Sequence, residues 1–184
     1  MKKIAKTNET KRLNLKMPSL RYTQMLQSAI EESVADLRLW LKWAQQTPSL
    51  AECAENISKA INAFDNQEDF QFYIFTKESP TFIGCAGLHR IDWSIPKAEI
   101  GYWIKASYQG HGYATEVSQW LTQFAFNELG VNRVEIRCDD NNTRSKSVAE
   151  KLGFILEGVL RDDTLTPDGK LRSTAVFSRV KQDY

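Results

Sequence analysis

The sequence predicts a mixed α+β fold, in which a mostly antiparallel sheet of six to seven strands is flanked by about four helices. Residues 70–104 hold three alternating apolar segments separated by turn residues, a pattern typical of an antiparallel meander. Residues 98–138 then follow a strand, helix, strand order, which brings the last strand back parallel to the first. The 184 residues contain no repeat and no linker rich in Pro or Gly, so we expect one domain, residues 1–184.

The N-terminal part is predicted to begin with a short strand and to continue in helices. Residues 13–17 alternate between apolar and polar side chains and stop before Pro18, which favours a strand. Residues 22–64 are rich in helix-forming residues and are interrupted at residues 47–49, Thr-Pro-Ser. This segment therefore predicts two or three helices.

The meander is predicted from three segments. In residues 70–75 and 98–104 the side chains alternate at every second position, and residues 82–88 are expected to run back between them. Residues 78–80 (Glu-Ser-Pro) and 91–96 supply the turns between them.

The C-terminal part alternates between helices and strands. Residues 113–129 carry apolar residues on one helical face, and Gly130 stands where a C-terminal cap belongs. Residues 131–138 favour a strand, and Asn142 can cap a following helix that Gly153 ends. Two further strands are expected at residues 154–160 and 174–180.

Composition and charge exclude several classes of protein. Lys and Arg number 24 and Asp and Glu 23, and 42% of the residues are hydrophobic, which is typical of a folded domain. Three separated cysteines without a CxxC motif and only two histidines argue against a disulfide framework and against a metal site. The chain lacks an apolar run that could span a membrane, and its start lacks the apolar core of a secretory signal. We therefore expect a cytoplasmic protein without a membrane partner.

Charge is unevenly distributed along the chain. Residues 1–20 carry six basic side chains and one acidic side chain (net +5), whereas residues 26–70 carry eight acidic and three basic ones (net −5). The basic segment lacks the interleaved aromatic residues of a nucleic-acid site, so a solvated terminus is the preferred interpretation. The acidic stretch is suited to attract a cationic substrate, although a solvated helix face explains it equally well.

A glycine-containing loop at residues 108–116 is the most informative stretch. It lies between a predicted strand and a long amphipathic helix, where converging backbone N–H groups and the helix N-terminus favour a phosphate or pyrophosphate. A plain glycine-rich turn is the alternative. A dinucleotide fingerprint would need glycine at Thr115, and no Walker Lys-Ser/Thr pair follows, so those nucleotide-binding motifs are excluded.

The spacing Gln109-x-x-Gly112-x-Ala114 resembles the Q/R-x-x-G-x-G/A signature of the GNAT acetyltransferases, whose loop holds the pyrophosphate of acetyl-CoA. Residues 98–104 resemble the fourth strand of that superfamily, and residues 142–158 resemble its closing segment. Residues 36–44 resemble the RimJ/RimL branch, which acetylates the N-termini of ribosomal proteins. The resemblance implies the GNAT acyl-CoA N-acyltransferase fold over most of the chain.

The resemblance also implies acetyl-CoA as co-substrate, without a metal. Backbone groups around Trp103 and Ile104 are expected to meet the pantetheine arm and the thioester, and Asn142 is expected to cap a helix and contact CoA. The pyrophosphate is expected against Gln109, Gly110, His111, Gly112, Tyr113 and Ala114. His111 is expected to contribute its backbone rather than its ring.

Acetyl transfer to an amine needs a base for the amine and an acid for the departing thiolate. Glu99 is the candidate base, because it alternates onto the same face as Gly101 and Trp103; a purely structural carboxylate is the alternative. Many members of the superfamily carry a tyrosine where this chain has Ala149, so the resemblance to the RimJ/RimL branch offers Ser145 as the acid. A helix-capping role is the alternative for Ser145.

The acceptor is the least specified part of the reaction. Trp40 and Trp43 are three residues apart and are expected to share a helical face, as ordinary core or as the wall of the acceptor groove. The leading prediction is transfer of acetyl to the N-terminal α-amine of a (ribosomal) protein, by direct attack in a ternary complex of a homodimer. A small amine such as a polyamine, amino acid or amino-sugar is the alternative acceptor, and a CoA-binding module without turnover is an alternative of another class.

Overall fold

The computed structural model describes residues 7–166 and 168–184. One eight-stranded sheet runs through them in the order β1-β2-β3-β4-β5-β6-β8-β7. The strands are β1 (Thr7–Glu9), β2 (Leu13–Lys16), β3 (Phe70–Thr76), β4 (Phe82–Asp92), β5 (Lys97–Ile104), β6 (Arg133–Asp139), β7 (Ile155–Leu165) and β8 (Leu171–Val180). The α-helices in these residues are α1 (Thr23–Trp40), α2 (Leu50–Asp65), α3 (Tyr113–Gln123) and α4 (Thr143–Lys151).

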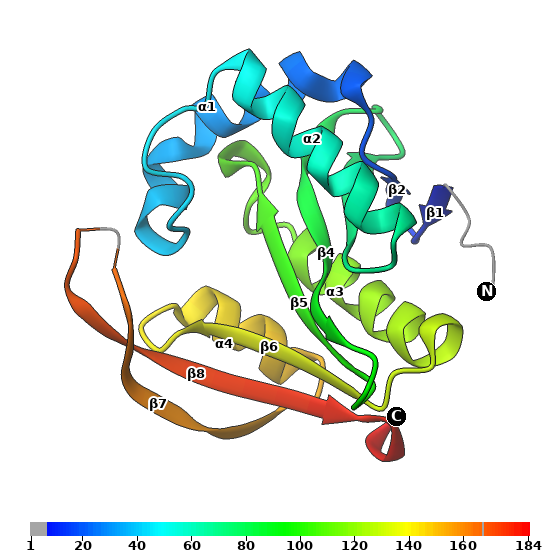
Figure 1. Cartoon of the computed structure of the whole chain (residues 1–184), viewed down its shortest axis with the longest axis vertical. Coiled ribbons are helices and arrows are strands. Elements are labelled where there is room, and N and C mark those ends of the chain that lie inside the picture. The colour runs from blue at the N-terminus through cyan, green and yellow to red at the C-terminus, as the bar shows by residue number, and fades with distance from the viewer. Residues whose placement is uncertain (1–6, 167) are drawn as a thin grey trace.

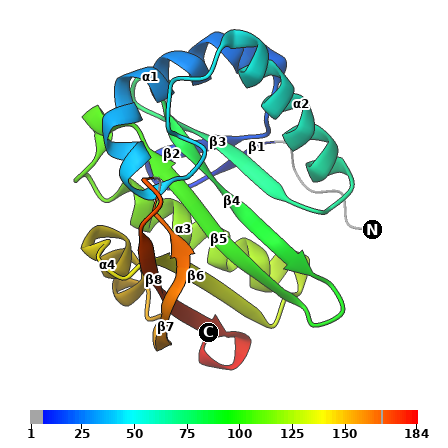
Figure 2. The same ribbon diagram turned by 60° about the vertical axis from the view of Figure 1, so that its left-hand side comes forward.

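The helices lie in two layers, one on each face of the sheet (Figures 1 and 2). Helices α1 and α2 bury Tyr73, Phe75 and Cys85 of the sheet in one apolar cluster. Helices α3 and α4 cover the opposite face, where Ile100 and Ile136 belong to a larger cluster. The alternation of strand side chains therefore assigns each β5 residue to one of two environments.

The helices α1 and α2 confirm the predicted interruption at residues 47–49. Ser49 begins α2 with a capping box, in which its side chain accepts from the backbone of Glu52 and the Glu52 carboxylate accepts from the backbone of Ser49. Helix α1 ends at Trp40, because Leu41 is extended. A non-helical segment, residues 41–49, thus joins the two helices.

Strands β5 and β6 form the one parallel pair among the described strands, and this confirms the predicted mixed, mostly antiparallel sheet. Their pairing covers only three positions, Lys97 with Arg133, Ala98 with Val134 and Glu99 with Glu135. Beyond Glu99 the two strands diverge, as Figure 1 shows. The sheet is therefore open between the C-terminal halves of β5 and β6.

The structure has more strand than the sequence pattern predicts. Strand β1 is added at one edge, and β7 and β8 extend well beyond the predicted residues 154–160 and 174–180. Strand β7 is the other edge of the sheet and is exposed along most of its length. An edge strand with so little buried surface lacks the alternation by which strands are recognised.

The predicted helix over residues 113–129 is confirmed with one local change. Helix α3 continues without a break into a π-helical segment, Phe124–Leu129. Gly130 follows in the left-handed region at φ 73°, which confirms the predicted glycine cap. No helix in the described residues is long and apolar enough to cross a membrane.

Candidate active site

The glycine-containing loop joins β5 to α3 through two left-handed residues. Gly110 and Gly112 both have φ 78°, a conformation that glycine adopts without the strain that a Cβ would bring. Gly112 is also the N-cap residue of α3, and no side chain caps this end of the helix. The uncapped first turn of an 11-residue helix leaves backbone donors and a partial positive charge available to an anion.

Arg12 fixes this loop from a distant part of the sequence. Its Nε donates to Oε2 of Glu116 at 2.6 Å, and its Nη1 donates to the carbonyl of His111 at 3.0 Å. The guanidinium also lies 4.6 Å from the ring centroid of Tyr113. Arg12 therefore holds the loop against α3 and adds a cation beside Gly112.

Gln109 is held at both ends of its side-chain amide. Its Nε2 donates to the carbonyl of Ile104 at 3.2 Å, and its Oε1 accepts from Nη1 of Arg144 at 2.7 Å. Arg144 belongs to the first turn of α4, so a second guanidinium lies on the other side of the loop. Two guanidinium groups, two left-handed glycines and a free helix end together fit a pyrophosphate.

The His111 ring folds back on its own loop. Its Nδ1 lies 2.8 Å from the carbonyl of Gln109, and the ring stacks on Tyr113 with centroids 5.9 Å apart. Both contacts are within the loop, so the ring shapes the turn.

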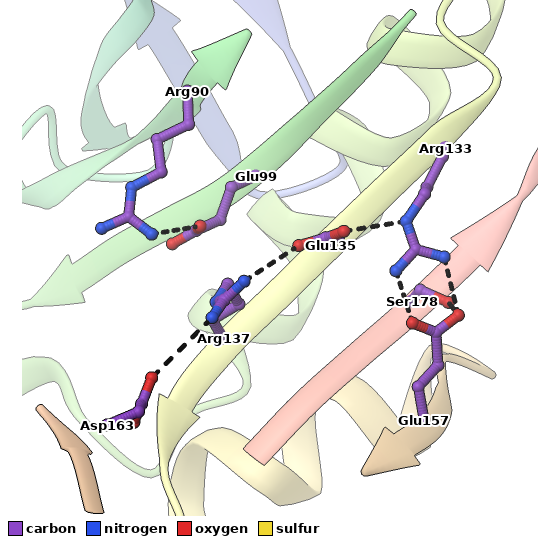
Figure 3. Close-up of polar contacts among 8 residues, drawn as sticks. All are labelled: Arg90, Glu99, Arg133, Glu135, Arg137, Glu157, Asp163 and Ser178. Carbon is purple, nitrogen blue, oxygen red and sulfur yellow. Dashed lines mark hydrogen bonds and ion pairs between the residues drawn. The ribbon is translucent and has the colours of Figure 1, made fainter. Parts of the chain in front are cut away.

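Glu99 lies in a charged network on the face covered by α1 and α2 (Figure 3). Its side chain is 20% exposed and its Oε2 is 3.1 Å from Nη1 of Arg90. Burial raises the pKa of Glu99, while the charges of Arg90 and Arg137 oppose that rise. A carboxylate with a raised pKa accepts a proton more readily than an ordinary one.

The network continues across β6 to β7 and β8. Glu135, the register partner of Glu99, accepts from Arg133 at 2.8 Å and lies 3.7 Å from Arg137 (Figure 3). Arg133 in turn donates to both carboxylate oxygens of Glu157, at 2.6 and 2.5 Å. Charged side chains of both signs thus lie along this face beside the β5–β6 pairing, and Arg137 lies just beyond its end.

Ser145 lies on the opposite face, in the first turn of α4. Its backbone N–H donates to Oδ1 of Asn142, which confirms the predicted cap. Its hydroxyl shares a hydrogen bond of 2.9 Å with the hydroxyl of Tyr102. Burial raises the pKa of Tyr102 to about 12, so this phenol stays protonated at neutral pH. Ala149 is buried in the core, and the phenol of this site comes from β5 instead.

The alternation of β5 separates the two catalytic candidates. Glu99, Gly101 and Trp103 face α1 and α2, whereas Tyr102 faces α3 and α4 and reaches Ser145. The base candidate and the acid candidate therefore flank the opening between β5 and β6 from opposite sides.

The two tryptophans of the predicted groove do not share a helical face, and that expectation is wrong. Helix α1 ends at Trp40, and Trp43 lies in the turn beyond it because Leu41 is extended. Trp43 is 53% exposed, and its ring meets that of Trp103 edge to face with centroids 6.4 Å apart. Trp40 is half-buried, and its carbonyl accepts from Arg172 of β8 at 3.3 Å. Neither ring belongs to the buried core.

Comparison with known proteins decides the family. Residues 12–155 match the acetyltransferase (GNAT) domain, a span that includes β5, the loop, α3, β6 and α4. The chain belongs to the GNAT acetyltransferase family.

Relatives within the GNAT family support the RimJ/RimL-like branch. The chain is 31% identical over 128 residues to the ribosomal-protein-serine acetyltransferase of Escherichia coli K12, covering 67% of this chain and 70% of that protein. It is 36% identical over 114 residues to the uncharacterized N-acetyltransferase p20 of Bacillus licheniformis, covering 62% of this chain but only 64% of p20. The solved structure of RimL, a ribosomal L7/L12 alpha-N-protein acetyltransferase in complex with coenzyme A, superposes with a TM-score of 0.88 at 22% identity. That superposition covers 95% of this chain and 97% of RimL, and it shows a shared fold.

Sequence reasoning missed three side chains of this GNAT site. Arg12 contacts the carboxylate of Glu116, 104 residues away, and no local pattern in the sequence predicts such a pair. The strand pattern gives Tyr102 no role in the site, because its partner Ser145 is 43 residues away. Arg144 stands inside the segment that resembles the family, yet its contact with Gln109 depends on how α4 packs beside the loop.

Proposed function

We propose that this chain transfers the acetyl group of acetyl-CoA to the N-terminal α-amine of a protein, by direct attack in a ternary complex. The observation that carries the proposal is the position of Glu99 and Ser145 on opposite faces of the sheet, at the opening between β5 and β6. The loop at Gln109–Ala114 lies at the same end of β5 and suits the pyrophosphate of the co-substrate.

The two faces supply the two halves of the reaction. Acetyl-CoA would bind along α3 and α4, with its pyrophosphate at the loop, its pantetheine arm along the backbone of Trp103 and Ile104, and Asn142 as a further contact. The acceptor amine would approach from the side of α1 and α2 and lose a proton to Glu99 as the C–N bond forms. The C–S bond then breaks, and Ser145 gives its hydroxyl proton to the thiolate. Ser145 then takes a proton from solvent and Glu99 releases its proton to solvent, so both side chains return to their starting states. Tyr102 orients Ser145 through their shared hydrogen bond.

An α-amine suits a site whose base is a carboxylate such as Glu99, because an appreciable fraction of the amine is already neutral. Its ordinary pKa is near 8, so about a tenth of it is neutral at pH 7, whereas less than about 0.1% of a lysine side chain is neutral. The names of the RimL structure and of the Escherichia coli relative support a ribosomal protein as the acceptor. Trp43 and Trp103 offer an aromatic wall on the acceptor side.

The test is a screen of hexapeptides with different N-terminal residues alongside spermidine, free amino acids and glucosamine, read by release of CoA thiol. The expected result is a higher kcat/KM for peptide N-termini than for every small amine. A small amine that outcompetes all peptides would overturn the acceptor class and leave acetyl transfer intact. Binding of acetyl-CoA without turnover on any amine would instead indicate a CoA-binding module.

A homodimer is the assembly we propose, formed through the edge strand β7. Its side chains Ile155, Leu156, Val159, Leu160 and Leu165 are large, apolar and exposed. Sedimentation should give a dimer for the wild type and for Leu20→Lys, which changes another exposed apolar residue outside β7, and a monomer for Ile155→Lys. A monomeric wild type at micromolar concentration would refute the dimer.

A cytoplasmic location of the protein remains a prediction.

A further inference from the structure

A histidine and an aspartate outside the family motifs form a pair on the acceptor face. His89 lies on β4 in register with Glu99 of β5, so the two side chains share the face covered by α1 and α2. Nδ1 of His89 is 2.5 Å from Oδ2 of Asp69, which ends the turn between α2 and β3. Neither side chain is buried completely, at 35% and 30% exposed.

Two glycines let the His89 ring lie flat on the sheet. A Cβ added to Gly101 would lie 2.8 Å from Cδ2 and 3.0 Å from Nε2 of His89, and a Cβ on Gly87 would also crowd the ring, at 3.2 Å. Gly101 is the first β5 residue on this face after the pairing with β6 ends at Glu99. Nε2 of His89 therefore lies at the edge of the opening between β5 and β6.

The Asp69 carboxylate sets which nitrogen of the ring is free. A neutral imidazole that donates Nδ1–H to Asp69 carries its lone pair on Nε2. Nε2 makes no hydrogen bond with any residue in 7–166 or 168–184. Asp69 from the α2–β3 turn contacts the ring, Glu99 of β5 is its register partner and interacts with it electrostatically, and Arg90 pairs with Glu99.

We propose that Nε2 of His89, oriented by Asp69, accepts the proton that an ammonium acceptor must lose before it can attack the thioester. The proposal rests on the proposed function and assigns a second base to it. R–NH₃⁺ and an acetyl thioester give an acetamide, a free thiol and one H⁺, so the nitrogen loses two protons. Glu99 takes the proton that leaves as the C–N bond forms, and His89 takes the earlier one and releases it to solvent.

The experiment compares two acceptors in the full-length protein. One is a hexapeptide with an N-terminal serine, and the other is the same peptide capped with an aminooxyacetyl group, whose nitrogen is already neutral at pH 7. With the serine peptide, His89→Gln should lower kcat/KM about tenfold at pH 7, because the tenth of the α-amine that is already neutral in solution can still react. The loss should disappear towards pH ~9, where most of the α-amine is neutral in solution. With the aminooxy peptide, His89→Gln should match the wild type, whereas Glu99→Gln should still be impaired.

Three further variants separate proton transfer from structure. Asp69→Asn should show a smaller loss with the same dependence on pH and acceptor, and Glu68→Gln, an exposed carboxylate one residue away, should behave as wild type. Gly101→Ala should reproduce the His89→Gln pattern, because the added Cβ displaces the ring. An equal loss with both acceptors, or full activity of His89→Gln on the serine peptide, would overturn the proposal. Absence of transfer by the wild type to either acceptor would refute the proposed function instead.

Discussion

Ser145 takes part in a helix cap through its backbone and in the proposed proton transfer through its hydroxyl. Its backbone binds Asn142 while its hydroxyl contacts Tyr102, so replacing the hydroxyl leaves the cap in place. We predict that Ser145→Ala lowers kcat about 10²-fold or more with little change in acetyl-CoA affinity. Steady-state kinetics and calorimetry check this, with Ser147→Ala in the same helix as control. Near-native turnover of Ser145→Ala would assign the proton to water or to the backbone.

Trp43 is exposed, so replacing it distinguishes a role in binding the acceptor from a role in the stability of the core. We predict that Trp43→Ala raises the KM for the peptide acceptor about tenfold, equivalent to ~1.4 kcal/mol, because the ring lines the acceptor side beside Trp103. The KM for acetyl-CoA should not change. The free energy of unfolding should fall by less than the ~3–5 kcal/mol typical of a buried aromatic ring. Chemical denaturation and kinetics give both values; a large loss of stability with an unchanged KM would place Trp43 in the core.

The site residues that the sequence could predict are those carried by local spacing. Gln109 and Gly112 stand at fixed offsets within the loop, and Asn142 stands before a helix, where the structure confirms the predicted cap. The contacts of Gln109 and Gly112 with a pyrophosphate stay a prediction. Arg12 and the pair Asp69–His89 depend on contacts between separate elements, which periodicity does not encode.

At the scale of elements, the α3 helix offers a matched pair of glycines. Gly112 precedes its first residue and Gly130 ends its π-helical extension, with φ 78° and 73°. A Cβ at Gly112 meets only Nη2 of Arg12, at 3.6 Å, and one at Gly130 meets nothing within 4 Å, so the cost of alanine at either site is backbone strain. We predict that both Gly→Ala variants lose roughly 1 kcal/mol of stability.

Only one of the two variants should affect the co-substrate. Gly112→Ala should weaken acetyl-CoA binding measured by calorimetry, because the loop and the first turn of α3 would hold the pyrophosphate. Gly130→Ala should bind acetyl-CoA like the wild type. Equal affinity of both variants for acetyl-CoA would contradict the proposal that this loop binds the pyrophosphate.

The strands β6, β8 and β7 are linked by Arg133, Glu157 and Ser178 (Figure 3). Hydrogen bonds from Arg133 and then Ser178 lower the pKa of Glu157 from 4.5 to about 2. Because the unfolded chain binds the proton more tightly, this contribution to stability is present above pH 4.5 and is lost as the pH falls towards 2. We predict that Glu157→Gln has a flatter dependence of unfolding free energy on pH in that window, by ~0.5–1 kcal/mol after solvent screening. Denaturation at several pH values would contradict this if both proteins lost stability in parallel.

The elements with regular periodicity were predictable, and those at the edges of the sheet were not. The buried strands β3, β4 and β5 and the helix α3 keep one apolar face, so their patterns predict them. Strand β7 is exposed along most of its length, and it follows β8 through pairs such as Leu160 with Thr174 and Thr164 with Arg172 rather than through burial. The pairing is irregular between these two pairs, where Asp162 is left-handed at φ 51°. The end of α1 at Trp40 likewise follows from tertiary contacts, including that of Arg172 with the Trp40 carbonyl.

At the scale of the whole molecule, the proposed function divides the reaction between the two faces of one sheet. Helices α3 and α4 form the side suited to the co-substrate, and α1, α2 and the charged network form the side suited to the acceptor (Figures 1 and 3). The pairing of β5 with β6 ends at Glu99, which is in register with His89, and Ser145 contacts the same strand β5 through Tyr102 on the opposite face. A direct attack needs no covalent intermediate in such an arrangement.

The most direct test of the central claim is an internal competition within one peptide that has a free N-terminal serine and an internal lysine. The peptide is incubated with acetyl-CoA and the protein at pH 7, and tandem mass spectrometry locates the acetyl group. We predict acetylation of the α-nitrogen alone, because about a tenth of that amine is neutral at this pH against less than about 0.1% of the lysine amine. Acetylation of the lysine side chain, or of neither amine while spermidine is acetylated, would contradict the assignment of this chain as an N-terminal α-amine acetyltransferase.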